Sequence, residues 1–252
     1  MAEALLRVER VFKRFGGLLA VDDASFVVEA GRITALIGPN GAGKTTLFSI
    51  ISGFLAPSGG RIFYRGTDVT GVPPHLLARR GIGRTFQIAQ PFAGLTVREI
   101  IAIGAHLSRR SRAQALDAAA EIASTVGLGE LLSRPAASLT VAGRKRLEVA
   151  RVLATNPKLL LLDEVLAGLN PWEVAAMVPI IRGLVDRGIT ILMIEHVMQA
   201  VMSLAEHVFV LAEGRIIAEG APQVVVSNAR VVEAYLGRGA AARLSAAGAL
   251  HV

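Results

Sequence analysis

A glycine-rich segment from Gly38 to Thr46 constrains the fold of this chain more than any other feature. It reads Gly-Pro-Asn-Gly-Ala-Gly-Lys-Thr-Thr and fits the pattern G-x-x-x-x-G-K-[ST]. An apolar, β-rich run over residues 32–37 precedes it, and a helix-like run to Ile51 follows it. In such a strand, loop and helix, glycines turn successive backbone N–H groups towards a polyphosphate, and the positive end of the helix dipole adds to that field. The segment therefore predicts a phosphate-binding loop.

The last residues of this loop have side chains that suit a nucleotide. Lys44 is expected to reach the β- and γ-phosphates, and the Thr45 hydroxyl is expected to bind Mg²⁺. A surface turn rich in Gly and Lys is the alternative, but a chance match between a strand and a helix is rare. The predicted loop residues are Gly38, Pro39, Asn40, Gly41, Ala42, Gly43, Lys44, Thr45 and Thr46.

Two further apolar runs lead to polar residues. Four leucines at 159–162 are followed by Asp163 and Glu164, and the run at 189–194 lies shortly before His196. Continuous apolar runs that alternate with helices are typical of a parallel sheet, where ligands bind at the carboxyl ends of strands. We expect Asp163 to bind Mg²⁺, Glu164 to accept a proton from the attacking water, and His196 to contact the γ-phosphate or that water. Carboxylates that only cap a helix and a structural histidine are the alternatives.

The rest of the chain separates into β-rich and helical regions. The sequence predicts antiparallel strands at 5–11, 24–28, 61–66, 208–211 and 215–219. Alanine-rich segments between Arg84 and Ala154, such as 111–126 and 144–154, predict an inserted helical subdomain. Phe15 lies in a glycine-rich turn, where stacking on a base and partial burial in a core are both open.

Composition limits the possible functions without choosing among them. The 252 residues have no cysteine, which excludes disulfides and thiolate chemistry, and no apolar run approaches the roughly 18 residues needed to cross a bilayer. The N-terminus shows no signal-peptide core, so a cytoplasmic protein is expected. The net charge of +7 suits nucleic acid, an anionic membrane or a nucleotide site. Six arginines are expected to form a solvated face, or else to contact anionic lipid, namely Arg79, Arg80, Arg84, Arg109, Arg110 and Arg112.

Taken in order, these motifs resemble those of the ATP-binding subunits of ABC transporters, over nearly the whole chain to about Gly237. The phosphate loop is similar to Walker A, residues 159–164 are similar to Walker B with its catalytic glutamate, and His196 is similar to the switch histidine. The resemblance also implies that Phe15 stacks on adenine. It further implies that Gln87 is the Q-loop glutamine, which binds Mg²⁺ and senses the membrane partner.

Residues 139–143, Leu-Thr-Val-Ala-Gly, fall by position on the family signature LSGGQ and depart from it. A hydroxyl remains at Thr140, whereas Val141 and Ala142 replace both glycines, which restricts the backbone and brings side chains towards the nucleotide. Asn170 stands where the D-loop of the family usually has Asp, which removes a charge at the expected dimer seam. The resemblance implies nucleotide contacts, across a head-to-tail dimer, by Thr140, Val141, Ala142 and Gly143.

The resemblance implies an α/β fold: a P-loop NTPase (RecA-like) core with an antiparallel β subdomain and an inserted α-helical subdomain. One ABC ATPase domain is expected over residues 1–237. Its expected parts are the core with the β subdomain (1–87 and 155–220), the helical subdomain (88–154) and a C-terminal helical segment (221–237), followed by a disordered tail (238–252).

The implied function is binding and hydrolysis of ATP with Mg²⁺, to power an importer. Implied partners are a second ATPase subunit, either identical or paralogous, membrane permease subunits at the inner face of the cell membrane, and indirectly a solute-binding protein, but no nucleic acid. Residues 166–171 and 232–237 look most like the ATPases of branched-chain amino acid importers, with urea and amide importers as close relatives. The alternatives are a regulatory module that holds ATP with little hydrolysis and an ATP-gated clamp on nucleic acid.

Overall fold

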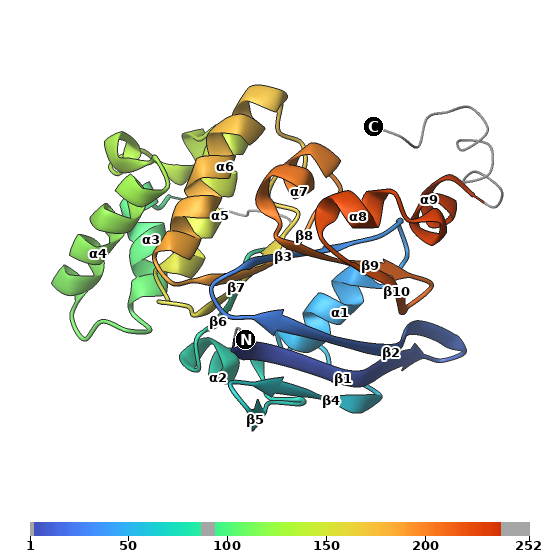
Figure 1. Ribbon diagram of the computed structural model, residues 1–252. Helices are drawn as coiled ribbons and strands as arrows, with labels where there is room; N and C mark the ends of the chain where they lie inside the picture. Colours follow the sequence, from blue (N-terminus) through green and yellow to red (C-terminus); the bar gives the residue numbers. More distant parts are fainter. Residues whose placement is uncertain (1–2, 87–93, 238–252) are drawn as a thin grey trace.

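Two β-sheets organise residues 3–86 and 94–237, the part of the chain that the computed structural model describes (Figure 1). The antiparallel sheet contains, in order across it, β2 (Leu18–Glu29), β1 (Ala4–Phe15), β4 (Gly59–Tyr64) and β5 (Thr67–Asp68). The larger sheet contains β10 (Arg215–Gly220), β9 (His207–Ala212), β3 (Ile33–Ile37), β8 (Thr190–Ile194), β7 (Leu159–Asp163) and β6 (Ile82–Arg84). All neighbours in the larger sheet are parallel except β10, which forms a hairpin with β9.

The central strands β3, β7 and β8 are buried at every residue, which explains their continuous apolar sequences. Their register fixes where they end. Ile194 of β8 pairs with Asp163 of β7 on one side and with Leu36 of β3 on the other. The carboxyl ends of the three strands therefore lie along one edge of the sheet.

Helices cover both faces of the larger sheet (Figure 1). In chain order, the helices of the described residues are α1 (Lys44–Ile51), α2 (Pro74–Arg79), α3 (Val97–Ala105), α4 (Arg112–Thr125), α5 (Val141–Leu153), α6 (Pro171–Asp186), α7 (Met198–Leu204), α8 (Pro222–Val226) and α9 (Ala229–Leu236). Helix α1 lies between the two sheets, and its Leu47 and Phe48 share a core with Leu36 and Leu161. Alternate residues of β7, such as Leu160 and Leu162, face a second core with α3 to α7. The phosphate-loop helix is thus held by apolar packing on both sides.

The structure confirms the predicted strands and helices, with shifted ends that have local causes. The strand predicted at 61–66 ends at Tyr64, because Arg65 and Gly66 turn the chain with φ of 51° and 74°. The helix predicted from residue 144 begins at Val141, because Thr140 caps it.

Helices α3, α4 and α5 form an insert between β6 and β7, and these two strands are neighbours in the sheet. The predicted start of the helical subdomain at residue 88 and the predicted tail lie outside the described residues.

Every helix in the described ranges is too short or too polar to cross a bilayer.

Candidate functional site

The phosphate loop connects β3 to α1 and depends on glycine at two close backbone approaches. A Cβ atom on Gly38, where φ is 153°, would lie 2.0 Å from the carbonyl oxygen of Leu211. On Gly43, where φ is 102°, it would lie 2.2 Å from the carbonyl oxygen of Ala20. The loop is therefore wedged against the neighbouring strands β2 and β9, and only glycine fits at these two positions.

Lys44 begins α1 and is buried, with its side chain turned back over the loop. Its Nζ donates to the carbonyl oxygens of Gly38 and Pro39 at 2.7 and 3.0 Å. Burial lowers the pKa of the Lys44 amine, and the nearby Glu164 carboxylate opposes that shift. The loop thus holds a cation beside backbone N–H groups, an arrangement that suits a polyphosphate.

The ends of β7 and β8 bring the predicted acidic and histidine residues together. The Asp163 side chain is almost fully buried, and its backbone N–H donates to Thr85 Oγ1 at 3.0 Å. Glu164 leaves the strand with φ of 50°, which turns its carboxylate to lie 3.7 Å from His196 Nδ1. The His196 ring is half-exposed, so it can reach a bound ligand. This edge can hold a metal ion and assist proton transfer.

The α5 helix braces the strained backbone at Glu164, a contact that local sequence patterns did not predict. Lys145 is buried and donates from Nζ to the Glu164 carbonyl oxygen at 2.9 Å. The Glu164 N–H donates to the Ile194 carbonyl oxygen at 3.0 Å. A positive φ at a non-glycine residue persists where surrounding contacts fix it. The insert therefore helps to set the direction of the Glu164 side chain.

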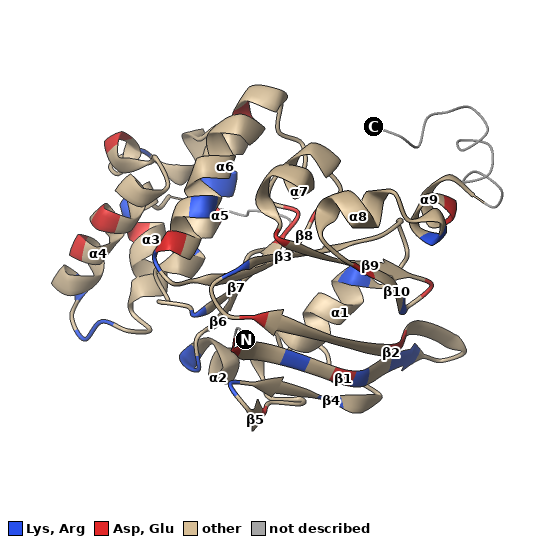
Figure 2. Cartoon of the chain, viewed as in Figure 1, with Lys and Arg blue, Asp and Glu red and all other residues tan. Residues whose placement is uncertain are grey.

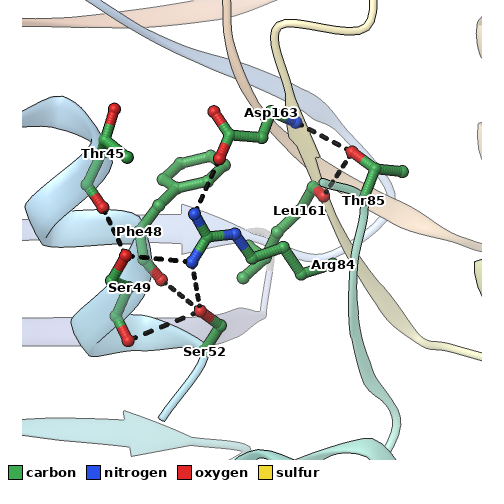
Figure 3. Close-up of polar contacts among 8 residues, drawn as sticks. All are labelled: Thr45, Phe48, Ser49, Ser52, Arg84, Thr85, Leu161 and Asp163. Atoms are coloured by element: carbon green, nitrogen blue, oxygen red, sulfur yellow. Dashed lines mark hydrogen bonds and ion pairs between the residues drawn. The ribbon is translucent and has the colours of Figure 1, made fainter. Parts of the chain in front are cut away.

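Arg84 corrects one prediction, because it does not belong to a solvated face. Its side chain is only 8% exposed, and its Nη2 donates to Asp163 Oδ2 at 2.7 Å (Figure 3). In the parallel register Arg84 lies opposite Leu161, whose side chain faces α1. The guanidinium therefore points between the sheet and α1 instead of into solvent. The other five arginines of that prediction are exposed.

Basic residues occur on many elements of the chain, including β1, α1 and α5 (Figure 2). The net charge of +7 is thus spread over several elements.

Glu195 is a second buried group that the sequence analysis did not single out. It is fully buried, its Oε1 accepts from the Leu166 N–H at 2.9 Å, and its Oε2 has no hydrogen-bond partner among the described residues. Burial raises the pKa of Glu195 to about 7, and the Glu164 carboxylate adds to that shift. The sequence signal that could have indicated this buried acid was its position at the end of an apolar strand, directly before His196.

The raised pKa of Glu195 makes stability depend on pH. Because the folded state keeps this proton up to about pH 7 and the unfolded state loses it near pH 4.5, the free energy of unfolding should fall as pH rises through that window. The change amounts to roughly 3 kcal/mol. Chemical denaturation from pH 4 to 8 should show this slope in the unchanged protein and lose it in Glu195→Gln. The exposed Glu219→Gln should keep it, and an equal slope in Glu195→Gln would refute the assignment.

The predicted signature residues lie at the start of α5, on the helical insert. Thr140 caps this helix through a hydrogen bond that its Oγ1 accepts from the Gly143 N–H at 3.1 Å. Val141 is 50% exposed and Ala142 is partly buried. The exposed hydroxyl and Val141 side chain are therefore available to a partner. At Asn170, the side chain and Glu173 form a reciprocal capping box for α6.

Two aromatic residues, Phe15 and Tyr235, lie at the edges of the site. The Phe15 ring is 46% exposed at the end of β1, with Lys13 Nζ 5.3 Å from the ring centroid, so it is not a core residue. Gln87 lies outside the described residues. On α9, burial raises the pKa of Tyr235, and a hydrogen bond from the Gly38 backbone N–H opposes that shift. The C-terminal segment thus reaches the phosphate loop, which the sequence analysis did not predict.

Comparison with known proteins identifies the family to which this arrangement belongs. Residues 21–167 match the family described as ABC transporter, which spans more than half of the chain and includes both the phosphate loop and the β7 acids. The chain belongs to the ABC transporter family. Residues 215–241 of this ABC cassette also match the family described as branched-chain amino acid ATP-binding cassette transporter.

Individual relatives resemble this ABC cassette over nearly its full length. It is 39% identical to the high-affinity branched-chain amino acid transport ATP-binding protein BraF of Pseudomonas aeruginosa, covering 94% of this chain and 99% of the relative. The same values hold for LivG of Escherichia coli. A nucleotide-free ATP-binding cassette and the ADP conformation of a cassette from an ABC transporter both have a TM-score of 0.86 and 35% identity, covering 94% of this chain and all of theirs. These findings confirm the predicted fold class.

Proposed function

We propose that this ABC cassette binds and hydrolyses ATP to power an importer for branched-chain amino acids or related small amides. The observation that carries this proposal is that Asp163 and Glu164 lie at the edge of the sheet where the glycine loop leaves β3, with Glu164 close enough to Lys44 to affect the pKa of its amine. The cargo is proposed from relatives that are named branched-chain amino acid transport proteins. Urea and amide importers remain within the proposal.

Each residue of the site has a proposed role. Lys44 neutralises the transferring phosphoryl group, Glu164 accepts the proton of the attacking water, and His196 holds that water or the γ-phosphate. Phe15 stacks on the adenine ring, which its exposure permits. The loop N–H groups and hydroxyls bind the phosphates through Gly38 to Thr46.

The donor atoms near the loop suit Mg²⁺, which favours oxygen ligands and nucleotide phosphates. The Thr45 hydroxyl on α1 and the Asp163 carboxylate at the end of β7 supply such oxygens, and the second Asp163 oxygen accepts no bond from Arg84 (Figure 3). We propose Thr45, Asp163 and Gln87 as its ligands. Bound there, Mg²⁺ would neutralise phosphate charge.

A second subunit, an identical chain or a paralogue, is proposed to complete the site. Its Thr140, Val141, Ala142 and Gly143 would contact the γ-phosphate through the start of α5, where backbone N–H groups and the Thr140 hydroxyl are available. The exposed position of Val141 supports this contact.

Restoring both glycines of the usual signature tests whether this variant signature works as it stands. Because main-chain N–H groups and Thr140 supply the donors in either case, the double change Val141→Gly and Ala142→Gly should alter ATP turnover by no more than about threefold. Steady-state phosphate release measures it, with Val224→Gly as a surface control for the loss of an exposed valine. A rise of several orders of magnitude would mean that the native signature is degenerate and that the chain mainly holds ATP.

Permease subunits are proposed to bind an apolar groove of about 380 Å³ beside Arg84. Its lining includes Phe54, Phe86 and Ile103, which are 53%, 40% and 44% exposed. Apolar rings left in solvent at a groove suit an amphipathic segment of a partner. This contact would place the chain at the inner face of the cell membrane, with a solute-binding protein acting indirectly through the permease.

Purification of the full chain with candidate permease subunits tests the function. ATP turnover by the chain alone, raised in the assembled complex, would support an importer. ATP binding without turnover in either state would support the regulatory module instead, and stimulation by nucleic acid would support the clamp. The receptor proteins that co-purify would identify the cargo class.

A further inference from the structure

Arg84 is buried against the proposed metal carboxylate of Asp163 (Figure 3), and it is also one of the residues that line the apolar groove. Its Nη2 donates to Asp163 Oδ2 at 2.7 Å. Its Nη1 donates at 3.2 and 2.8 Å to the hydroxyls of Ser49 in α1 and of Ser52, the residue that caps the end of α1. One guanidinium thus joins β6, β7 and α1 at the edge where the nucleotide is proposed to bind.

The positive charge of this guanidinium is compensated by the Asp163 carboxylate. The two serine hydroxyls are neutral, and Arg84 Nε is buried without a hydrogen-bond partner among the described residues. Both side chains of the ion pair are nearly inaccessible to water, at 8% and 4% exposure. A buried ion pair becomes costly when one member loses its partner, because the remaining charge is neither solvated nor compensated.

The same guanidinium contacts the rings that line the groove. Its Cζ atom lies 5.8 Å from the ring centroids of both Phe54 and Phe86, and those two rings meet edge to face at 5.3 Å. A cation at this distance is attracted to an aromatic face. The positions of the two rings are therefore linked to the position of the Arg84 charge.

We propose that Arg84 is a positioning residue that competes with the divalent cation for Asp163 and, through Phe54 and Phe86, couples that cation to the groove. This inference rests on the proposed function, because it needs a cation bound with the nucleotide. A divalent cation beside Asp163 repels the guanidinium and weakens the ion pair. The displaced charge then moves the two rings, which changes the surface that the groove presents.

The affinity test compares binding of the non-hydrolysable analogue AMP-PNP, in Mg²⁺ and in EDTA, by calorimetry on the full chain. The measured quantity is the factor by which Mg²⁺ tightens binding. Removing the competing charge in Arg84→Met should raise this factor at least about tenfold. Arg84→Lys keeps the charge and should stay within about threefold of the unchanged protein. Arg80→Met, an exposed position nearby, is the matched control.

The groove test uses the absence of cysteine from the chain. Ile103→Cys, labelled with an environment-sensitive dye, places a single probe in the groove. Adding Mg²⁺ to the AMP-PNP complex should change the emission of this probe both when Arg84 is retained and when Arg84→Lys is added. The change should be absent when Arg84→Met is added. If the Arg84–Asp163 salt bridge were purely structural, the emission change on addition of Mg²⁺ would not depend on whether residue 84 is charged.

The outcomes separate this inference from the proposed function. If the unchanged protein binds AMP-PNP with no help from Mg²⁺, the proposed metal-dependent function fails. If Mg²⁺ tightens binding equally in the unchanged protein and in Arg84→Met, the competition is refuted while the function stands. If Arg84→Met does not fold, Arg84→Lys decides. A Mg²⁺ factor more than about threefold above that of the unchanged protein overturns the role of the charge, and a factor within threefold with a normal probe response supports it.

Discussion

Replacing Glu164 with Gln should lower the rate of ATP hydrolysis by roughly 10²–10⁴-fold while leaving ATP binding intact. The amide cannot accept a proton from water, yet it has nearly the same size and can keep the hydrogen bonds that orient the side chain. The backbone contacts that turn this residue out of β7, from Lys145 and to Ile194, remain in the variant. Phosphate release and nucleotide binding, measured on the same preparation, check both halves of the expectation.

The variant should also accumulate an ATP-bound dimer, visible by size-exclusion chromatography, because the nucleotide that closes the dimer is no longer consumed. Glu130→Gln changes an exposed acid on the helical insert and should hydrolyse ATP at the normal rate. Unchanged turnover in Glu164→Gln would remove Glu164 from the role of general base.

Replacing Lys44 with Met should weaken ATP binding by roughly 10²–10⁴-fold. A charge-assisted hydrogen bond contributes about 1.5–3 kcal/mol, and the Lys44 amine is expected to reach two phosphates. Met keeps much of the length and the apolar stem of the side chain, so the loss of ATP affinity measures the contribution of the Lys44 charge. Calorimetric titration with ATP in the presence of EDTA measures the affinity for ATP without any contribution from Mg²⁺.

The exposed Lys158, at the opposite end of β7 from the acids, provides the control for this loss of charge. Lys158→Met should bind ATP normally. Unfolding of Lys44→Met should occur at a similar denaturant concentration to that of the unchanged protein, since among the described residues the Lys44 Nζ donates to two loop carbonyls. Equal ATP affinity in both variants would show that the loop does not bind phosphate through this lysine.

The fold and much of the site follow from patterns that are local in the sequence. The glycine spacing from Gly38 to Gly43 is readable because the loop needs glycine at close backbone approaches. The runs ending at Asp163 and before His196 are readable because buried parallel strands are apolar throughout. Both signals depend on residues close together in the chain.

What could not be predicted depends on partners far away in the sequence. Arg84 looked like one of several surface arginines, and its burial follows from pairing with an acid 79 positions later. Lys145 and Glu195 likewise acquire their roles from contacts with Glu164 and Leu166 across the sheet edge. Local sequence patterns do not indicate which of several arginines or lysines will pair with a buried acid far away in the chain.

The attachment of the helical insert has a mechanical consequence. The chain leaves the sheet after β6 and returns in β7, and these strands pair from Ile82 opposite Leu159 to Arg84 opposite Leu161. Rotation of the insert about the line through these two adjacent connections would leave the β6–β7 hydrogen bonds intact, but it would require the apolar contacts of α3 and α5 with the sheet to rearrange. Lys145 extends from the insert and donates to the Glu164 carbonyl oxygen. A rotation of the insert would therefore also change the orientation of Glu164, the proposed general base.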